Sequence, residues 1–136
     1  MKTIVPYIFF RGNCEQAMNF YKDCLHGEII TLQRFKDTEM PVDDDYREKI
    51  MHGELKAEQI HIMFSDGAPH KDIKEGNNVQ LSITLDDTDE QDRIFEALAE
   101  GGEITMPLEK TFWGARYGML KDKFGIRWML NCEIDD

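Results

Sequence analysis

The sequence predicts an α+β fold of two βαβββ modules whose curved mixed sheets surround a central cavity. The main observation is an internal repeat, because segments 13–29 and 88–104 share residues at positions 75 apart. Two copies are too few for a solenoid, which needs about three or more repeats. They suit a fold in which two similar halves share one core. The recurring residues are Glu15-Gln16 and Glu90-Gln91, Phe20 and Phe95, and Gly27-Glu28-Ile29 and Gly102-Glu103-Ile104.

The first module begins with an apolar, β-rich run at 3–10, which predicts a strand. Asn13 with Gln16 three residues later matches a capping box and predicts the start of a helix. The apolar face of this helix repeats every three or four residues. Gly27 is expected to end the helix in the left-handed conformation. Further strands are expected at 28–35, 48–55 and 59–64, with a polar, acidic loop at 36–47.

The second module repeats this order. Residues 79–85 alternate between apolar and polar and predict a strand. Thr88 with Gln91 matches a second capping box, and Gly101-Gly102 is expected to end the second helix. The remaining strands are expected at 103–108, 114–121 and 126–132.

Length and composition indicate one globular domain over residues 1–136. The chain has 41% hydrophobic residues, and a chain of this size buries about two thirds of its unfolded surface, so a core needs no covalent staples. The segment 67–76 is rich in Gly, Pro, Asp and Lys. It is expected to connect a first module at about 1–66 to a second module at 77–136.

The net charge of −11 disfavours binding to nucleic acid or to an anionic membrane surface, because such binding depends on Lys and Arg. No apolar run reaches the roughly 18–20 residues that span a bilayer. The N-terminal residues lack the long apolar region of a signal peptide. A cytoplasmic protein is therefore expected. Three cysteines without a CxxC pair agree with a reducing compartment.

Cys14 is expected at the first helical position, where the helix dipole can lower the pKa of a thiol. Two interpretations stay open for it. It is either a reactive thiol or a small residue tolerated at a helix start. Cys24 and Cys132 are interpreted as structural.

Three stretches that together span nearly the whole chain resemble one family. The first combines Pro6-Tyr7-Ile8-Phe9-Phe10 with Gly12-Asn13-Cys14-Glu15-Gln16-Ala17 and Phe20-Tyr21, and the second is Met63-Phe64-Ser65-Asp66 before Pro69. The third runs from Thr111-Phe112-Trp113-Gly114 through Tyr117-Gly118 to Asp122-Lys123-Phe124-Gly125 and Trp128-Met129-Leu130-Asn131. The chain thus resembles the PhnB-like branch of the vicinal-oxygen-chelate superfamily, which holds glyoxalase I, bleomycin-resistance proteins and extradiol dioxygenases. Some members of this branch carry the label 3-demethylubiquinone-9 3-methyltransferase. The resemblance implies the duplicated βαβββ architecture.

The resemblance also implies where a metal would be held, since metal-dependent relatives place His or Glu on the first, fourth, fifth and eighth strands. The matching positions here are Pro6, His61 or Met63, Gln80 and Met129. Proline has no ligating side chain, and glutamine and a thioether are poor ligands for a hard divalent ion. We therefore expect no metal site and no cofactor.

A ligand pocket is expected between the two sheets. Its candidate residues are Pro6, Ile8, His61, Met63, Gln80, Trp113, Arg116, Tyr117 and Met129. His61 is either a hydrogen-bonded structural residue or a ligand contact, whereas His52 is expected to face solvent. Trp113 and Tyr117 form either a pocket wall or a packing surface. Arg116 either binds an anionic group or is merely exposed.

Two functional hypotheses follow. The first is a metal-independent protein that binds a small molecule. The second is an enzyme that uses acid–base chemistry without a metal, with His61 or Glu54 as the base. An acidic partner for His61 would favour the enzyme, whereas a lining of apolar side chains with Gln80 would favour binding alone. A homodimer is expected. Methyltransferase activity is not, because the chain has no G-x-G-x-x-G segment.

Overall fold

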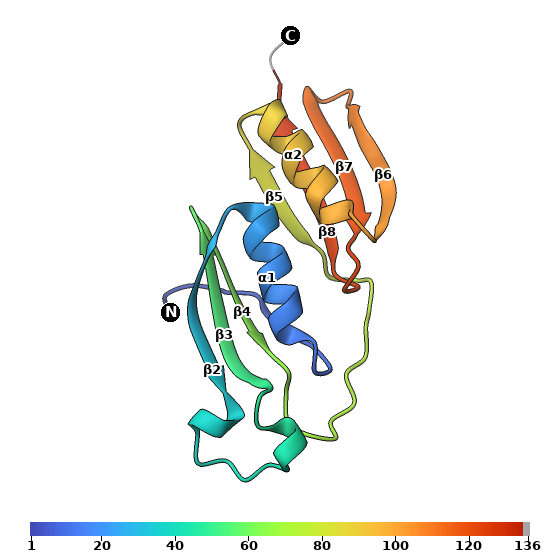
Figure 1. Ribbon diagram of the computed structural model, residues 1–136. Coiled ribbons are helices and arrows are strands. Elements are labelled where there is room, and N and C mark those ends of the chain that lie inside the picture. The colour runs from blue at the N-terminus through green and yellow to red at the C-terminus, as the bar shows by residue number, and fades with distance from the viewer. Residues whose placement is uncertain (135–136) are drawn as a thin grey trace. The chain divides into compact units, whose positions relative to one another are not determined.

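The computed structural model describes residues 1–134 and contains the predicted order of elements (Figure 1). The first half holds β1 (Tyr7–Phe9), α1 (Cys14–Leu25), β2 (Glu28–Arg34), β3 (Ile50–Ala57) and β4 (Ile60–Ser65). The second half holds β5 (Leu81–Leu85), α2 (Thr88–Ala99), β6 (Glu103–Lys110), β7 (Ala115–Lys121) and β8 (Arg127–Glu133). Two short 3₁₀ helices, η1 (Phe35–Asp37) and η2 (Asp44–Tyr46), lie in the segment predicted to be a loop.

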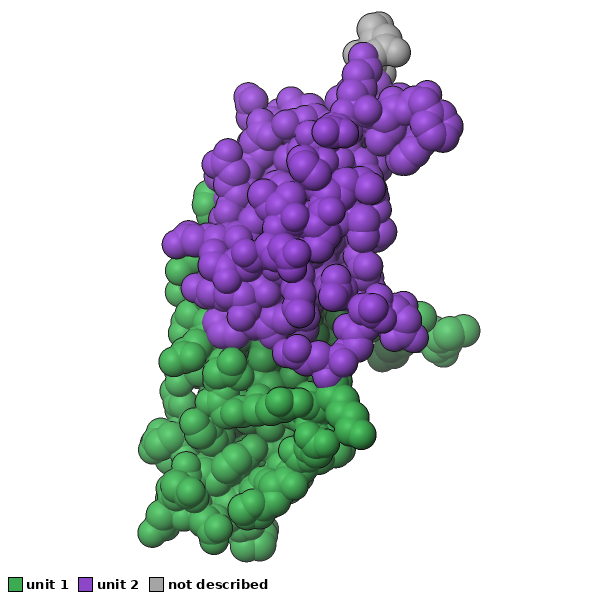
Figure 2. All heavy atoms as spheres, turned by 90° about the vertical axis from the view of Figure 1, so that its right-hand side faces the viewer, with its two compact units in different colours: residues 1–74 green, residues 75–136 purple. Residues whose placement is uncertain are grey.

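The chain divides into two compact units, residues 1–74 and residues 75–136, which are coloured separately in Figure 2. The boundary falls inside the segment 67–76 that the sequence marks as the connector. Each unit has the order βαβββ and one four-stranded sheet, so the predicted α+β modules are confirmed. A single domain with a cavity shared by both modules stays a prediction.

Both sheets have the same topology. The strand orders are β1-β4-β3-β2 and β5-β8-β7-β6. In each sheet the first neighbours in this order are parallel and the other neighbours are antiparallel, so both sheets are mixed. The first strand is shorter than the predicted 3–10, because Pro6 has no N–H to donate to the sheet. The Pro6 carbonyl still accepts a hydrogen bond from the Met63 N–H, at 2.9 Å.

Helix α1 covers one face of the first sheet (Figure 1). Leu55 and Phe64 lie on that face and are fully buried, and the Phe64 ring stacks on Tyr21 of α1 with ring centroids 5.9 Å apart. Because strand side chains alternate between faces, Glu54 and Met63 point to the opposite side. We call this side, turned away from α1, the distal face of the first sheet.

The helix starts were predicted at the correct places but with the wrong caps. Asn13 precedes α1, yet its side chain makes no capping hydrogen bond. In the second unit the cap is Asp87 and not Thr88, and the Asp87 carboxylate accepts a hydrogen bond from the Asp89 N–H at 3.2 Å. Both predicted capping boxes are therefore wrong.

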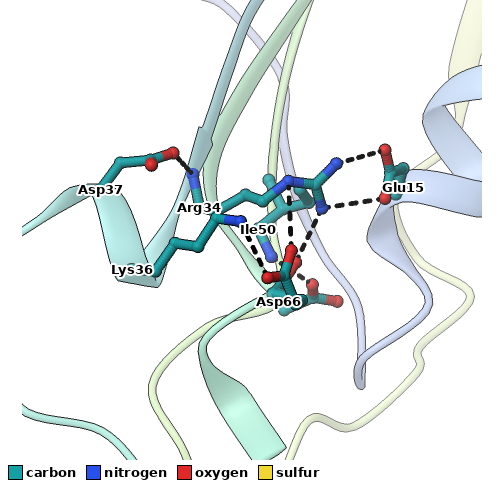
Figure 3. Close-up of polar contacts among 7 residues, drawn as sticks. Glu15, Arg34, Lys36, Asp37, Ile50 and Asp66 are labelled. Atoms are coloured by element: carbon teal, nitrogen blue, oxygen red, sulfur yellow. Dashed lines mark hydrogen bonds and ion pairs between the residues drawn. The ribbon is translucent and has the colours of Figure 1, made fainter. Parts of the chain in front are cut away.

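Asp66 supplies the missing cap of α1 from the end of β4. One of its carboxylate oxygens accepts hydrogen bonds from the N–H groups of Gly12 and Cys14, at 2.8 and 3.0 Å. The other oxygen accepts from the Ile50 N–H at 2.8 Å (Figure 3). Asp66 is only 3% exposed. This one side chain thus joins the start of α1, the start of β3 and the end of β4.

The repeated glycines serve close packing and not helix termination. His26 takes the left-handed conformation after α1, with φ 51°, whereas Gly27 does not. A Cβ on Gly27 would lie 2.8 Å from the Lys56 carbonyl oxygen. In the second unit Gly101 is left-handed, and a Cβ on Gly102 would collide with backbone atoms of Lys121 and Asp122. The expectation for Gly27 was therefore wrong, and Gly27 and Gly102 share a packing role.

No helix within residues 1–134 is long and apolar enough to cross a membrane.

Replacing Asp66 with Asn should destabilise the protein by about 2–4 kcal/mol, because one charged acceptor is lost and an amide group is turned toward buried N–H donors. Urea unfolding followed by circular dichroism measures the change. The exposed Asp23 on α1 provides a matched control, and Asp23→Asn should change the stability by less than about 0.5 kcal/mol. Equal stability of Asp66→Asn and the wild type would contradict the capping role.

Gly102→Ala should destabilise the protein by about 1–3 kcal/mol, since the new Cβ overlaps backbone atoms that cannot rotate away. The new Cβ would overlap the Lys121 carbonyl oxygen and would lie 2.9 Å from the Asp122 Cα. The matched control is Gly76→Ala, whose Cβ meets only the Asn78 side chain at 3.6 Å. Thermal unfolding of both variants and the wild type tests the prediction. A melting temperature of Gly102→Ala equal to that of Gly76→Ala would contradict the packing role of Gly102.

Candidate functional site

The distal face of the first sheet brings polar side chains from three strands together. The strand pairing sets Tyr7 beside Met63 and Met63 opposite Glu54. His52 lies two residues before Glu54 on β3, and His61 lies two residues before Met63 on β4, so both histidines share this face. The sheet register therefore gathers Tyr7, His52, Glu54 and His61, which we call the Glu54 cluster.

A continuous chain of hydrogen bonds connects the Glu54 cluster. The Tyr7 hydroxyl lies 2.8 Å from His52 Nδ1. His52 Nε2 lies 3.2 Å from one Glu54 oxygen, and His61 Nε2 lies 2.8 Å from the other. The two histidines and Glu54 are half-buried, with side chains 26%, 27% and 19% exposed. The cluster is thus ordered by its own contacts and still accessible.

The hydrogen-bond pattern fixes the direction of each donor when Glu54 is ionised. A carboxylate only accepts, so both histidines must carry a proton on Nε2. In neutral His52 the other nitrogen, Nδ1, is then an acceptor, and the Tyr7 hydroxyl donates to it. In neutral His61 the nitrogen Nδ1 is likewise an acceptor. No hydrogen bond to His61 Nδ1 is found within residues 1–134, so this acceptor is available to another molecule.

These contacts shift the ionisation of two groups. The hydrogen bond from His61, followed by the one from His52, lowers the pKa of Glu54. Burial raises the pKa of Tyr7, with smaller contributions from neighbouring groups. Glu54 is therefore a carboxylate and Tyr7 a neutral phenol over a wide pH range around neutrality.

Apolar and charged side chains border the cluster. The rings of Tyr7 and Phe9 stack with centroids 5.0 Å apart and are both partly exposed. Lys56 is exposed and stands directly opposite His61 in the antiparallel pair. Directly opposite residues have Cβ atoms about 4.5–5.5 Å apart. The cluster thus has an aromatic surface on one side and a cation on the other.

Comparison with known proteins assigns the family. A family profile described as 3-demethylubiquinone-9 3-methyltransferase matches residues 2–131. The chain belongs to this family. Protein PA1353 from Pseudomonas aeruginosa is 40% identical, with a TM-score of 0.90 over 99% of this chain and all of that one. The PhnB protein from Bacillus cereus, described with the same methyltransferase name, is 27% identical, with a TM-score of 0.80 over 96% of this chain and 99% of that one.

The fold extends to a wider superfamily, as expected for a PhnB-like protein. A glyoxalase/bleomycin resistance protein/dioxygenase family enzyme from Burkholderia phytofirmans is 15% identical, with a TM-score of 0.65. The match covers 94% of this chain and 95% of that one. At this identity the likeness shows the fold alone. The predicted PhnB-like family and the predicted glyoxalase-like fold are confirmed.

In this PhnB-like chain the candidate residues of the first unit divide between the two faces. His61 and Met63 lie on the distal face, as a shared pocket would require. Ile8 pairs with Phe64 and therefore lies on the face toward α1, so it does not share the distal face with His61 and Met63. Pro6 lies just before β1. Tyr7 was not among the residues predicted from the sequence. His52 was expected to face solvent, but the β3–β4 register brings it to the cluster.

The candidate residues of the second unit also divide. Met129 pairs with Met119, and Tyr117 pairs with Asn131, so these side chains share the face turned away from α2. Trp113 is 58% exposed and meets the Tyr117 ring edge-on, with centroids 6.3 Å apart. The predicted association of Trp113 with Tyr117 is present within this unit. Gln80 precedes β5, and its buried Oε1 has no hydrogen-bond partner within residues 1–134.

Arg116 contacts the second helix through its guanidinium. Its guanidinium lies 2.7 Å from an Asp92 oxygen and 3.3 Å from the Gln91 Oε1 atom. The buried Gln91 in turn donates to the carbonyls of Arg116 and Leu130. These contacts use the guanidinium to fix α2 on β7 and β8. The role of Arg116 in binding an anionic group stays a prediction.

A polar cleft lies beside the start of α1, away from the Glu54 cluster, with a volume of about 360 Å³. Arg34 and Glu15 form a bidentate pair across it, at 2.7 and 3.0 Å (Figure 3). This pair lowers the pKa of Glu15 through the Arg34 hydrogen bonds. Lys49 donates to the Gly12 carbonyl at 2.9 Å. Because these charges are already paired with the protein itself, the cleft is a structural joint between α1 and β2.

Neither a reactive thiol nor a metal-binding group is found in the first unit or elsewhere in residues 1–134. Cys14 is fully buried, and burial followed by the charges of Asp66 and Glu15 strongly raises the pKa of its thiol. The reactive interpretation of Cys14 is therefore wrong. No three His, Cys, Asp or Glu side chains among these residues are arranged to hold a metal ion.

Nuclear magnetic resonance titration should find the Glu54 carboxyl with a pKa below the ordinary value for Glu. His61→Gln should raise that pKa more than His52→Gln, because the His61 contact is shorter. The hydrogen bonds stabilise the fold above the ordinary pKa, and this stability is lost as the pH falls through the lowered pKa. The exposed His70 is the control, and His70→Gln should leave the Glu54 titration unchanged. An unchanged Glu54 pKa in His61→Gln would contradict the cluster geometry.

Proposed function

We propose that this PhnB-like protein binds a small organic molecule on the distal face of the first sheet, without a metal ion. The supporting observation is the Glu54 cluster, a set of oriented polar groups beside exposed aromatic rings. Binding sites commonly combine apolar surface with a few fixed polar atoms. A structural network would consume all of its acceptors, whereas His61 Nδ1 is available. The cluster therefore suits ligand recognition better than support of the fold.

Metal-independent binding is proposed because of the chemistry of the donors. The strand positions beside Tyr7 and Ser82 carry the thioethers of Met63 and Met129. Thioethers are poor ligands for hard divalent ions. Both histidines direct Nε2 to Glu54, so these nitrogens are already used.

No methyltransferase activity is proposed, although the family carries that name. Each sheet has a single parallel strand pair, and the chain lacks the glycine-rich turn between a strand and a helix that commonly holds a nucleotide-like cofactor. The enzyme hypothesis without a metal is favoured by one observation, the hydrogen bond between His61 and Glu54. An oriented imidazole of this kind is typical of general bases.

We further propose that the partner of the chain is a second copy of itself. Both β2 and β6 are edge strands, and they carry exposed apolar residues. These are Ile30 and Leu32 on β2, and Ile104 and Met106 on β6. Exposed apolar edge strands are typical of sheet pairing between chains. The three free cysteines fit a reducing compartment, so the proposed location is the cytoplasm.

A thermal-shift screen of small aromatic and polar compounds tests the binding proposal. A ligand at a hundredfold excess over its Kd adds about 2.7 kcal/mol to the stability and should raise the Tm by several degrees. Tyr7→Phe and His61→Gln should reduce this rise, whereas His70→Gln should not. The screen is repeated with a chelator and with added Zn²⁺, Ni²⁺ or Mn²⁺. A ligand response that requires a metal, or one unaffected by both cluster variants, would overturn the proposal.

A further inference from the structure

We propose that His61 is a general base that takes the proton of a bound aromatic hydroxyl group, so that a phenol-type ligand is held as its anion. This inference rests on the binding function proposed above and assigns its ligand class. The transfer is balanced without a co-reactant: the O–H bond breaks, its electron pair stays on the ligand oxygen, and the proton forms an N–H bond at His61 Nδ1. The deprotonated oxygen is then a stronger nucleophile than the hydroxyl.

The geometry around His61 supports the base role. Its Nε2 proton is directed to Glu54 at 2.8 Å, which leaves Nδ1 as the atom that can accept a proton. The Glu54 carboxylate stabilises the imidazolium that forms, as an orienting carboxylate does beside a catalytic histidine. Glu54 is itself held by His52. We therefore assign Glu54 as the positioning residue and His61 as the group that meets the ligand.

The surroundings of His61 also suit the anion that is produced. Lys56 stands opposite His61 on β3 and is exposed, so its ammonium can pair with the ligand oxygen. Glu28 on β2 stands on the other side of Lys56 in the sheet. Another charged group beside the aromatic rings is Lys71, whose Nζ lies 5.9 Å from the Phe9 ring centroid. A cation near an ionisable hydroxyl favours its charged form.

The ligand class follows from the acceptors and the rings. The atom of the cluster that faces a ligand is the acceptor His61 Nδ1, so the cluster suits a molecule that donates a proton. The stacked Tyr7 and Phe9 rings offer partly exposed aromatic surface beside the cluster. Aromatic rings in offset or edge contacts attract each other beyond the effect of the area they bury. An aromatic hydroxyl compound uses both features at once, whereas a simple aliphatic alcohol uses only one and is a weaker acid.

The test uses para-nitrophenol, whose phenolate absorbs visible light and whose neutral form does not. The absorbance is measured at a pH below the pKa of the free probe. The phenolate-to-phenol ratio of the probe bound to wild-type protein should be about tenfold higher than that of the free probe at the same pH, which equals about one pKa unit. His61→Gln should abolish the increase, and Glu54→Gln and Lys56→Met should reduce it. Glu96→Gln on the exposed face of α2 is the matched control and should behave as the wild type.

Equilibrium dialysis with para-nitroanisole, which has the same ring but no ionisable hydroxyl, separates binding from proton transfer. Retained binding of this probe by His61→Gln, together with loss of the phenolate signal, supports the base role. Binding of both probes with no phenolate increase, or an increase that persists in His61→Gln, overturns it and leaves the binding function standing. Failure of the wild type to bind para-nitrophenol also overturns the inference, whereas the thermal-shift screen decides the binding function separately.

Discussion

The buried carboxylate of Asp66 is the contact on which the first unit depends. It accepts three backbone N–H groups, from Gly12, Cys14 and Ile50, which belong to segments far apart in the sequence. A buried charge is costly unless its acceptors are satisfied, so these segments must meet for the fold to form. Since α1 and β3 start at this carboxylate, it fixes the helix on one face of the sheet. The distal face, with the Glu54 cluster, is therefore the face of the sheet that α1 does not cover.

The second unit also contains a buried carboxylate, that of Asp122. Asp122 is buried in the turn between β7 and β8, where its oxygens accept from the N–H groups of Phe124 and Ile126 and from the indole of Trp128. This carboxylate closes a hairpin and does not cap a helix. The two units therefore share topology and the close-packed Gly27 and Gly102, but their buried carboxylates join different elements. The faces turned away from the helices also differ, since Met63 pairs with Glu54 in the first sheet and Met129 pairs with Met119 in the second.

The Glu54 cluster differs from the buried carboxylates in its exposure. The carboxylates of Asp66 and Asp122 accept hydrogen bonds from backbone N–H groups and, for Asp122, from an indole N–H. Each residue is 3% exposed. The Glu54 carboxylate instead accepts hydrogen bonds from two histidines, and about a quarter of the side-chain surface of each histidine is accessible. An accessible imidazole with a fixed orientation can meet a bound molecule, whereas a buried carboxylate bound to backbone N–H groups is closed off from one. A carboxylate side chain thus supports the fold in one place and forms a candidate reaction site in another.

The sequence by itself determined the two βαβββ modules, the PhnB-like family and the position of the connector, because periodicity, glycines and repeated residues act over short distances along the chain. It also singled out His61 and Glu54 as candidate bases. Only the tertiary structure decided that these two residues meet and that His52 and Tyr7 join them, since this depends on how β1 and β3 align with β4. The same holds for Arg116, which turns toward α2, and for Asp66, which caps a helix that begins 52 residues earlier. Strand pairing and long-range hydrogen bonds depend on packing between segments far apart in the sequence, so the pattern along one segment does not fix them.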